Sequence, residues 1–68
     1  MKNYYVNKQA QSNGDHEVHT EDCRYLPNLS NRKALDKHGN CKSAVTEAKK
    51  TYTQSNGCKT CSLDCHTS

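Results

Sequence analysis

Two short stretches decide the fold of this chain: residues 58–61 read Cys-Lys-Thr-Cys, and residues 19–23 read His-Thr-Glu-Asp-Cys. The first is a C-x2-C motif that follows Gly57. Two thiolates at this spacing bind one metal ion from a tight turn, whose backbone amides donate to the sulfurs. The second is an H-x3-C motif, which adds an imidazole and a third thiolate. Together they predict a closed Cys3His site for one structural Zn2+, with the ligands His19, Cys23, Cys58 and Cys61.

The C-x2-C spacing also serves redox dithiols, where the motif lies in a βαβ unit. Here the motif follows the one helix that the sequence predicts, instead of opening a helix. This order favours a structural metal site over a redox pair.

Composition explains why the chain needs such a site. The 68 residues are 31% hydrophobic and include no Phe or Trp. A domain this small buries only a modest fraction of its surface, and apolar burial barely offsets the entropy of ordering the chain. The five cysteines and four histidines can supply the missing stabilisation. We expect residues 1–68 to form a single zinc-stapled domain in which the last residues, 62–68, are frayed.

The expected fold class is α+β, with a short antiparallel β-sheet of two or three strands and one α-helix. Residues 4–7 are rich in β-formers, and residues 16–19 return as a second strand. Between them, residues 11–15 include an Asn-Gly pair, which readily adopts positive φ in a turn. Residues 32–36 are expected to add a third short strand.

The helix is expected at about residues 41–52. Asn40 is a good N-cap for it. Small or apolar side chains recur at helical spacing and form one narrow stripe, namely Cys41, Ala44, Val45, Ala48 and Tyr52. After the helix, residues 54–57 read Gln-Ser-Asn-Gly and are interpreted as a turn that leads into the C-x2-C motif.

The remaining sulfur and imidazole groups leave alternatives open. Cys65 or His66 could replace His19 as the fourth ligand, because the C-terminal cysteines continue the motif as C-x2-C-x3-C. Cys41 lies on the apolar stripe and is interpreted as a buried free thiol. Cys65 could instead be exposed, or pair with Cys41 on oxidation.

Residues 1–8 lack the apolar run of a secretory signal, and no stretch approaches the roughly 20 apolar residues that span a bilayer. We therefore expect a cytoplasmic protein with no membrane partner, in which clustered cysteines stay reduced and indicate metal binding. The formal net charge of +3 is mild and spread along the chain, which is a weak basis for nucleic-acid binding.

The order of these motifs resembles the zinc-binding N-terminal domain of the Ada DNA-repair protein and the small Ada-like zinc modules found beside nucleases. The matching stretches are residues 18–23, 43–48 and 57–61. The resemblance implies a zinc scaffold with His19, Cys23, Cys58 and Cys61 as ligands. In that family the first residue of a C-x3-C motif is the thiolate that accepts a methyl group from DNA; here that position is His19, so the resemblance does not imply methyl transfer. The ending Asn-Gly-Cys-x2-Cys, with a final Cys-His, also resembles small bacterial proteins, and this likeness implies no function.

The function expected from these observations is a structural zinc-binding module, not an enzyme, that mediates an interaction with a protein or a nucleic acid. A chain of this size leaves little room for a substrate pocket, so no small-molecule substrate is expected. One alternative is a thiol-based redox or alkyl-acceptor protein that uses Cys58 and Cys61, Cys41 or Cys65. Another is a secreted binding module stapled by two disulfides, with one spare cysteine and no metal.

Overall fold

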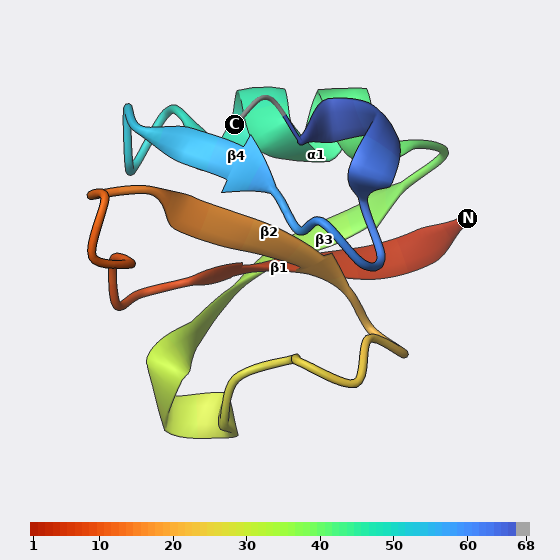
Figure 1. Ribbon diagram of the computed structural model, residues 1–68. Helices are drawn as coiled ribbons and strands as arrows, with labels where there is room; N and C mark the ends of the chain where they lie inside the picture. Colours follow the sequence, from red (N-terminus) through yellow and green to blue (C-terminus); the bar gives the residue numbers. More distant parts are fainter. Residues whose placement is uncertain (67–68) are drawn as a thin grey trace.

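The computed structural model describes residues 1–66 and confirms an α+β fold with one helix packed on a small sheet (Figure 1). The four strands follow the order β3-β1-β2-β4 across the sheet. In chain order the elements are β1 (Lys2–Asn7), β2 (His16–Thr20), the 3-10 turn η1 (Leu29–Asn31), β3 (Arg32–His38), α1 (Cys41–Ala48), β4 (Ser55–Gly57) and the 3-10 turn η2 (Leu63–Cys65).

The three strands expected from the sequence form the antiparallel part of the sheet. β1 lies between β2 and β3 and pairs with both in antiparallel fashion. The turn between β1 and β2 lies where the Asn-Gly pair predicted it, with Gly14 at a φ of +93°. The amide of Gly14 donates to the carbonyl of Gln11 over 2.8 Å and closes this turn. The prediction of the third strand is also confirmed, and that strand extends to His38.

The fourth strand was not anticipated, because its sequence, Ser-Asn-Gly, is poor in β-formers and was interpreted as a turn. β4 forms because the free edge of β2 offers hydrogen-bonding groups, and the two strands pair in parallel. The amide of His16 donates to the carbonyl of Gln54 over 2.9 Å, and the amide of Cys58 donates to the carbonyl of Val18 over 2.9 Å. Tertiary context, and not local propensity, makes this strand, and it turns an antiparallel sheet into a mixed one.

The helix begins at the predicted residue and ends earlier than expected. The side chain of Asn40 accepts a hydrogen bond from the amide of Ser43 over 3.1 Å, which confirms its role as N-cap. After Ala48 the backbone hydrogen bonds include the tighter 3-10 type, since the amide of Lys50 donates to the carbonyl of Glu47, three residues earlier. The chain turns there so that it can run back along β2 as β4.

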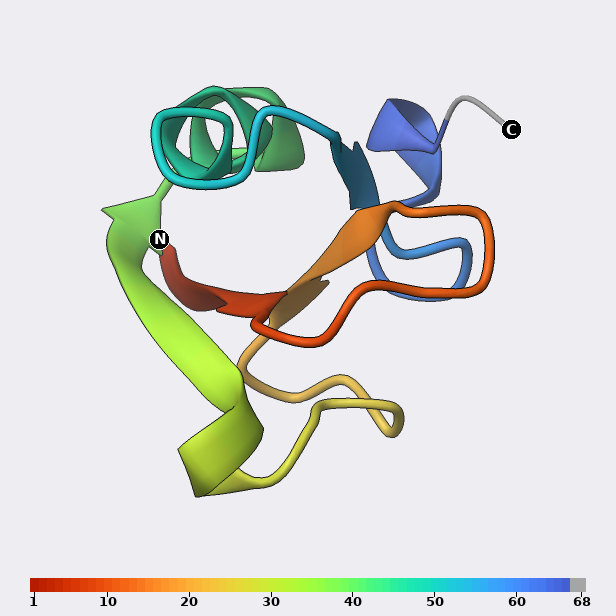
Figure 2. The same cartoon turned by 90° about the vertical axis from the view of Figure 1, so that its left-hand side faces the viewer.

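The core lies between α1 and one face of the sheet (Figures 1 and 2). It consists of Tyr4, Val6, Val18, Leu35, Cys41, Ala44 and Ala48. The two alanines are fully buried and let the helix approach the strands closely. The connection that includes η1 runs on the opposite side of the sheet, so α1 and this connection lie on the two sides of one thin layer.

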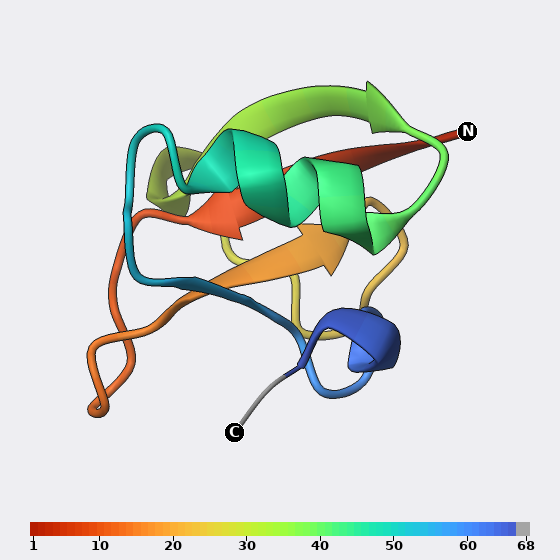
Figure 3. The same cartoon turned by 90° about the horizontal axis from the view of Figure 1, so that it is seen from above.

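The C-terminal segment is tied into the fold by a disulfide between Cys41 and Cys65, whose Cα atoms are 6.2 Å apart. The interpretation of Cys41 as a free thiol is therefore wrong, and the alternative pairing of Cys65 with Cys41 is the one present. Of the segment 62–68 that we expected to fray, Ser62 is buried and residues 63–65 form η2, which lies near the N-terminal end of α1 (Figure 3). Residues 67 and 68 lie outside the described residues.

Gly57 lies at the point where β4 meets this segment. A Cβ atom at this position would lie 2.6 Å from the carbonyl oxygen of Ser62 and 2.7 Å from the Cβ of Cys65. We expect Gly57→Ala to destabilise the fold by about 1–3 kcal/mol, because overpacking forces the backbone to shift. Urea unfolding of the metal-free, oxidised protein measures this change.

The matched control is Gly39→Ala, because a Cβ there would meet no atom within 4 Å. Equal stabilities for the two variants would contradict the close packing of β4 against η2.

Candidate metal centre

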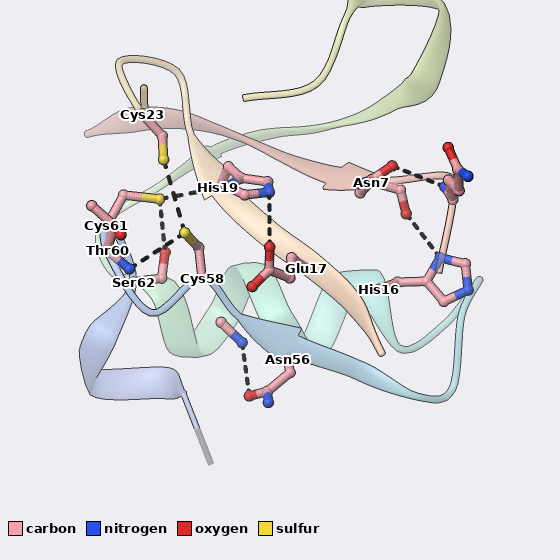
Figure 4. Close-up of polar contacts among 12 residues, drawn as sticks. Asn7, His16, Glu17, His19, Cys23, Asn56, Cys58, Thr60, Cys61 and Ser62 are labelled. Carbon is pink, nitrogen blue, oxygen red and sulfur yellow. Dashed lines mark hydrogen bonds and ion pairs between the residues drawn. The ribbon is translucent and has the colours of Figure 1, made fainter. Parts of the chain in front are cut away.

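Four side chains from distant parts of the sequence converge on one point (Figure 4). One nitrogen or sulfur atom from each lies within 4.8 Å of the corresponding atoms of the others. The residues are those that the sequence singled out as ligands: His19, Cys23, Cys58 and Cys61. They come from the end of β2, the connection after it, the end of β4 and the turn that follows. The cluster is close enough to hold a metal ion.

His19 is brought to the cluster by the alternation of side chains along β2. Val18 faces the core, so His19 faces the other side of the sheet, and it is only 1% exposed. Its Nδ1 lies 3.9 Å from the Sγ of Cys61. Its Nε2 lies 3.7 Å from a carboxylate oxygen of Glu17, two residues earlier on the same face (Figure 4). The ring therefore presents Nδ1 to the sulfurs and Nε2 to a carboxylate.

Cys58 and Cys61 are positioned by backbone hydrogen bonds. The pairing of β4 with β2 continues to Cys58, whose side chain consequently lies on the same side of the sheet as His19. The amide of Ser62 donates to the carbonyl of Cys58 over 2.9 Å and closes the turn between the two cysteines. The amide of Thr60 donates to the Sγ of Cys58 over 3.4 Å. Such amide donors to sulfur are typical of turns that bind metals through C-x2-C.

Cys23 approaches the same point from the connection after β2. Its amide donates to the carbonyl of Thr20 over 3.1 Å, which forms the turn that leads out of the strand. Its Sγ lies 3.9 Å from the Sγ of Cys58. Thr20 contributes a second time, because its amide donates to the Sγ of Cys61 over 3.3 Å.

Two of the separations in the cluster are close to those expected around a single metal ion. With Zn–S bonds of about 2.3 Å, two thiolates on one tetrahedral zinc are about 3.8 Å apart. The Cys23–Cys58 sulfur pair and the His19–Cys61 nitrogen–sulfur pair are each separated by 3.9 Å. At these two pairs the atoms need little movement to surround one ion, and all four atoms lie within 4.8 Å of one another.

The thiols of the cluster do not ionise alike. Burial, followed by the hydrogen bond to Cys61, raises the pKa of Cys23 to about 12. Burial also works against ionisation of Cys61, but the hydrogen bonds that it accepts from Cys23 and Thr20 outweigh this effect and lower its pKa. Burial lowers the pKa of His19, against the attraction of Glu17, so the imidazole is neutral and able to donate a lone pair. Metal binding would displace the proton of Cys23, because a cysteine binds metal as the thiolate.

The alternative ligands lie outside the cluster. Cys65 is bonded to Cys41, so its interpretation as a fourth ligand is wrong for this structure. The Nδ1 of His66 is 3.0 Å from the carbonyl oxygen of Gly57. Cys23, Cys58 and Cys61 are free thiols, so the alternative of two disulfides with one spare cysteine does not agree with the structure, which has one disulfide among residues 1–66.

Glu17 and the amide of Thr20 belong to the site but were not expected from the sequence. For Glu17 a signal existed, because a residue two positions before His19 in a strand shares its face. For the amide of Thr20 no sequence signal existed, since any residue type supplies the same backbone group.

A comparison of the chain with protein-family models, curated proteins and solved structures finds no match. The resemblance to the Ada-like modules stays a prediction from the motifs.

The structure fixes how many thiols the protein offers. We expect the purified protein, denatured without reductant and in the presence of a chelator, to react with an alkylating agent at three cysteines. Prior reduction should raise the number to five, because it opens the Cys41–Cys65 bond. Intact mass and peptide mapping measure both values; one reactive thiol or five before reduction would contradict the arrangement.

Proposed function

We propose that this chain is a structural zinc-binding module, with one Zn2+ held by His19, Cys23, Cys58 and Cys61. The observation that carries the proposal is the convergence of these four side chains on one point, with one nitrogen or sulfur atom from each within 4.8 Å of the others. A set of three sulfurs and one nitrogen in tetrahedral arrangement is typical of structural zinc. The carboxylate beside the Nε2 of His19 supports the proposal, because a metal-bound histidine usually donates its other N–H to such a group.

The zinc would stabilise a fold whose core is thin. It would join the end of β2, the connection after it and the C-x2-C turn, which are separate in the sequence. Structural zinc contributes on the order of 10 kcal/mol of apparent folding free energy in small peptides. Four protein ligands fill a tetrahedral shell and leave no position for a substrate, which supports a structural role over a catalytic one.

The module would act through its surface by binding a macromolecule. The connection that begins at Cys23 presents two large exposed side chains, Tyr25 at 59% and Leu29 at 76% exposure. The guanidinium of Arg24 lies 5.7 Å from the ring centre of Tyr25. The metal would fix the start of this connection, so that a partner would bind a surface that is already ordered. Exposed Tyr, Leu and a single Arg fit a protein partner better than a nucleic acid, which is normally met by several cations on one face.

A salt titration decides between the two kinds of partner. Affinity for DNA or RNA that weakens with added salt would support the nucleic-acid version. An absence of DNA and RNA binding at low ionic strength would exclude a nucleic-acid partner and favour a protein partner.

The cytoplasmic localisation stays a prediction. Within residues 1–66 the structure has no helix with the length and apolarity needed to cross a bilayer. The Cys41–Cys65 disulfide weighs against a permanently reducing compartment, because thiol systems there open most disulfides.

The metal content tests the proposed function directly. We expect one zinc per chain in protein purified without chelator, and loss of that zinc in Cys23→Ser, because a hydroxyl group does not replace a thiolate ligand. Native and denaturing mass spectrometry, with metal analysis, measure the content.

Lys59→Ala is the matched control, since Lys59 lies in the same C-x2-C turn and is exposed. Wild-type protein that takes up no zinc on reconstitution would refute the proposal, as would a Cys23→Ser variant that keeps full affinity.

Glu17 offers a second test of the ligand geometry. We expect Glu17→Gln to keep the zinc but to weaken its binding by about tenfold, because the change removes the carboxylate charge beside the Nε2 of His19. Competition with a chromophoric chelator measures the affinity. Glu47→Gln, on the exposed side of α1, removes the same charge far from the site; an equal loss in both variants would show that the effect is general electrostatics.

A further inference from the structure

The disulfide of this chain joins two segments that also meet near the proposed metal centre. Cys41 is the first residue of α1, and Cys65 is the last residue of η2. Cys65 follows the ligand Cys61 by four residues. The bond therefore fastens the chain just after the C-x2-C turn to the helix that covers the sheet (Figure 3).

The fastened segment packs directly against the C-x2-C turn. Ser62 is 3% exposed, its amide closes the turn through the carbonyl of Cys58, and its Oγ lies 3.8 Å from the Sγ of Cys61. On the other side Gly57, immediately before Cys58, leaves no room for a Cβ beside Cys65. A movement of η2 would consequently shift the backbone on both sides of Cys58.

The disulfide is also within reach of solvent. Cys65 is half-buried, and Cys41, although only 8% exposed, lines a pocket of about 330 Å3 that opens between α1, β1 and the C-x2-C turn. The same pocket is lined by Cys61 and Ser62. A small reductant can therefore meet the bond without prior unfolding of the sheet.

We propose that the Cys41–Cys65 disulfide is a redox-sensitive clasp that sets the affinity of the metal centre. The proposal rests on the proposed zinc binding. In the oxidised form η2 is held on α1, and the ligands Cys58 and Cys61 are held in place with it. Two molecules of a thiol reductant open the clasp: their sulfurs join in a new disulfide, the Cys41–Cys65 bond breaks, and their two protons pass to Cys41 and Cys65.

The direction of the effect follows from the coupling of metal binding to folding. Zinc binds the assembled site and not the open chain, so its apparent affinity includes the free energy needed to assemble that site. A disulfide restricts the open chain, and for the 24-residue separation of Cys41 and Cys65 the entropy model predicts an effect on the order of 100-fold in the folding equilibrium. Opening the clasp therefore weakens zinc binding. By linkage, bound zinc makes the disulfide harder to reduce by the same factor.

The test compares the dissociation constant for Zn2+ among three forms of the full chain: oxidised wild type, wild type reduced with a phosphine, and the double variant Cys41→Ser/Cys65→Ser. A phosphine is used because it reduces disulfides without offering a competing thiolate. We expect the dissociation constant to rise in the reduced and the double-variant forms. The upper limit of this rise is the full contribution of the disulfide, which is on the order of 100-fold. The double variant should not respond to the phosphine.

A dissociation constant that is unchanged or lower after reduction would overturn the clasp and leave the zinc module standing. A double variant that stays unfolded at saturating zinc, as judged by circular dichroism, would also overturn it, because the disulfide would then be a condition for folding. Absence of zinc binding in every form, including oxidised wild type, would refute the metal centre itself. A slower reduction of Cys41–Cys65 in the zinc-loaded protein than in the metal-free protein would support the clasp independently.

Discussion

The rest of the structure depends on the parallel pairing of β4 with β2, because this pairing brings the C-terminal segment from residue 55 onward to the side of His19. The pairing consists of few hydrogen bonds, among them the one from the amide of Cys58 to the carbonyl of Val18. It places Cys58 next to the histidine and on the same side of the sheet. Cys61, Ser62 and η2 follow from that position, and so does the meeting of Cys65 with Cys41.

Sulfur chemistry stabilises the two sides of the sheet in different ways. On the side of α1 the core is small and relies on close packing by Ala44 and Ala48, with the disulfide at the start of the helix. On the other side lies the cluster of His19 with three free cysteines, which would stabilise the fold by holding the proposed zinc. A chain of 68 residues with few large apolar side chains needs such covalent or coordinate links, since burial alone leaves little net stability.

The proposed zinc and the disulfide are connected through one segment, residues 57–65, and the proposed redox regulation depends on this connection. Ser62 contacts both cysteines of the C-x2-C turn, while Gly57 packs against Cys65. Opening the disulfide would therefore alter the position of the C-x2-C turn, and metal binding at that turn would alter the position of Cys65. The exposed connection after Cys23 extends from the same cluster. The position of a partner-binding surface on this connection would therefore depend on the metal bound by Cys23.

The sequence by itself determined the local parts of this protein. The Asn-Gly turn, the capped start of the helix at Asn40, the antiparallel strands and the identity of the four clustered residues follow from turn chemistry, capping, periodicity and motif spacing, which act over a few residues. Only the tertiary structure decided the rest. The strand Ser55–Gly57 exists because the edge of β2 was free, α1 ends at Ala48 because the chain must return to that edge, and Cys65 pairs with Cys41 because η2 packs beside the helix. These features depend on contacts between residues far apart in the chain, which no local pattern encodes.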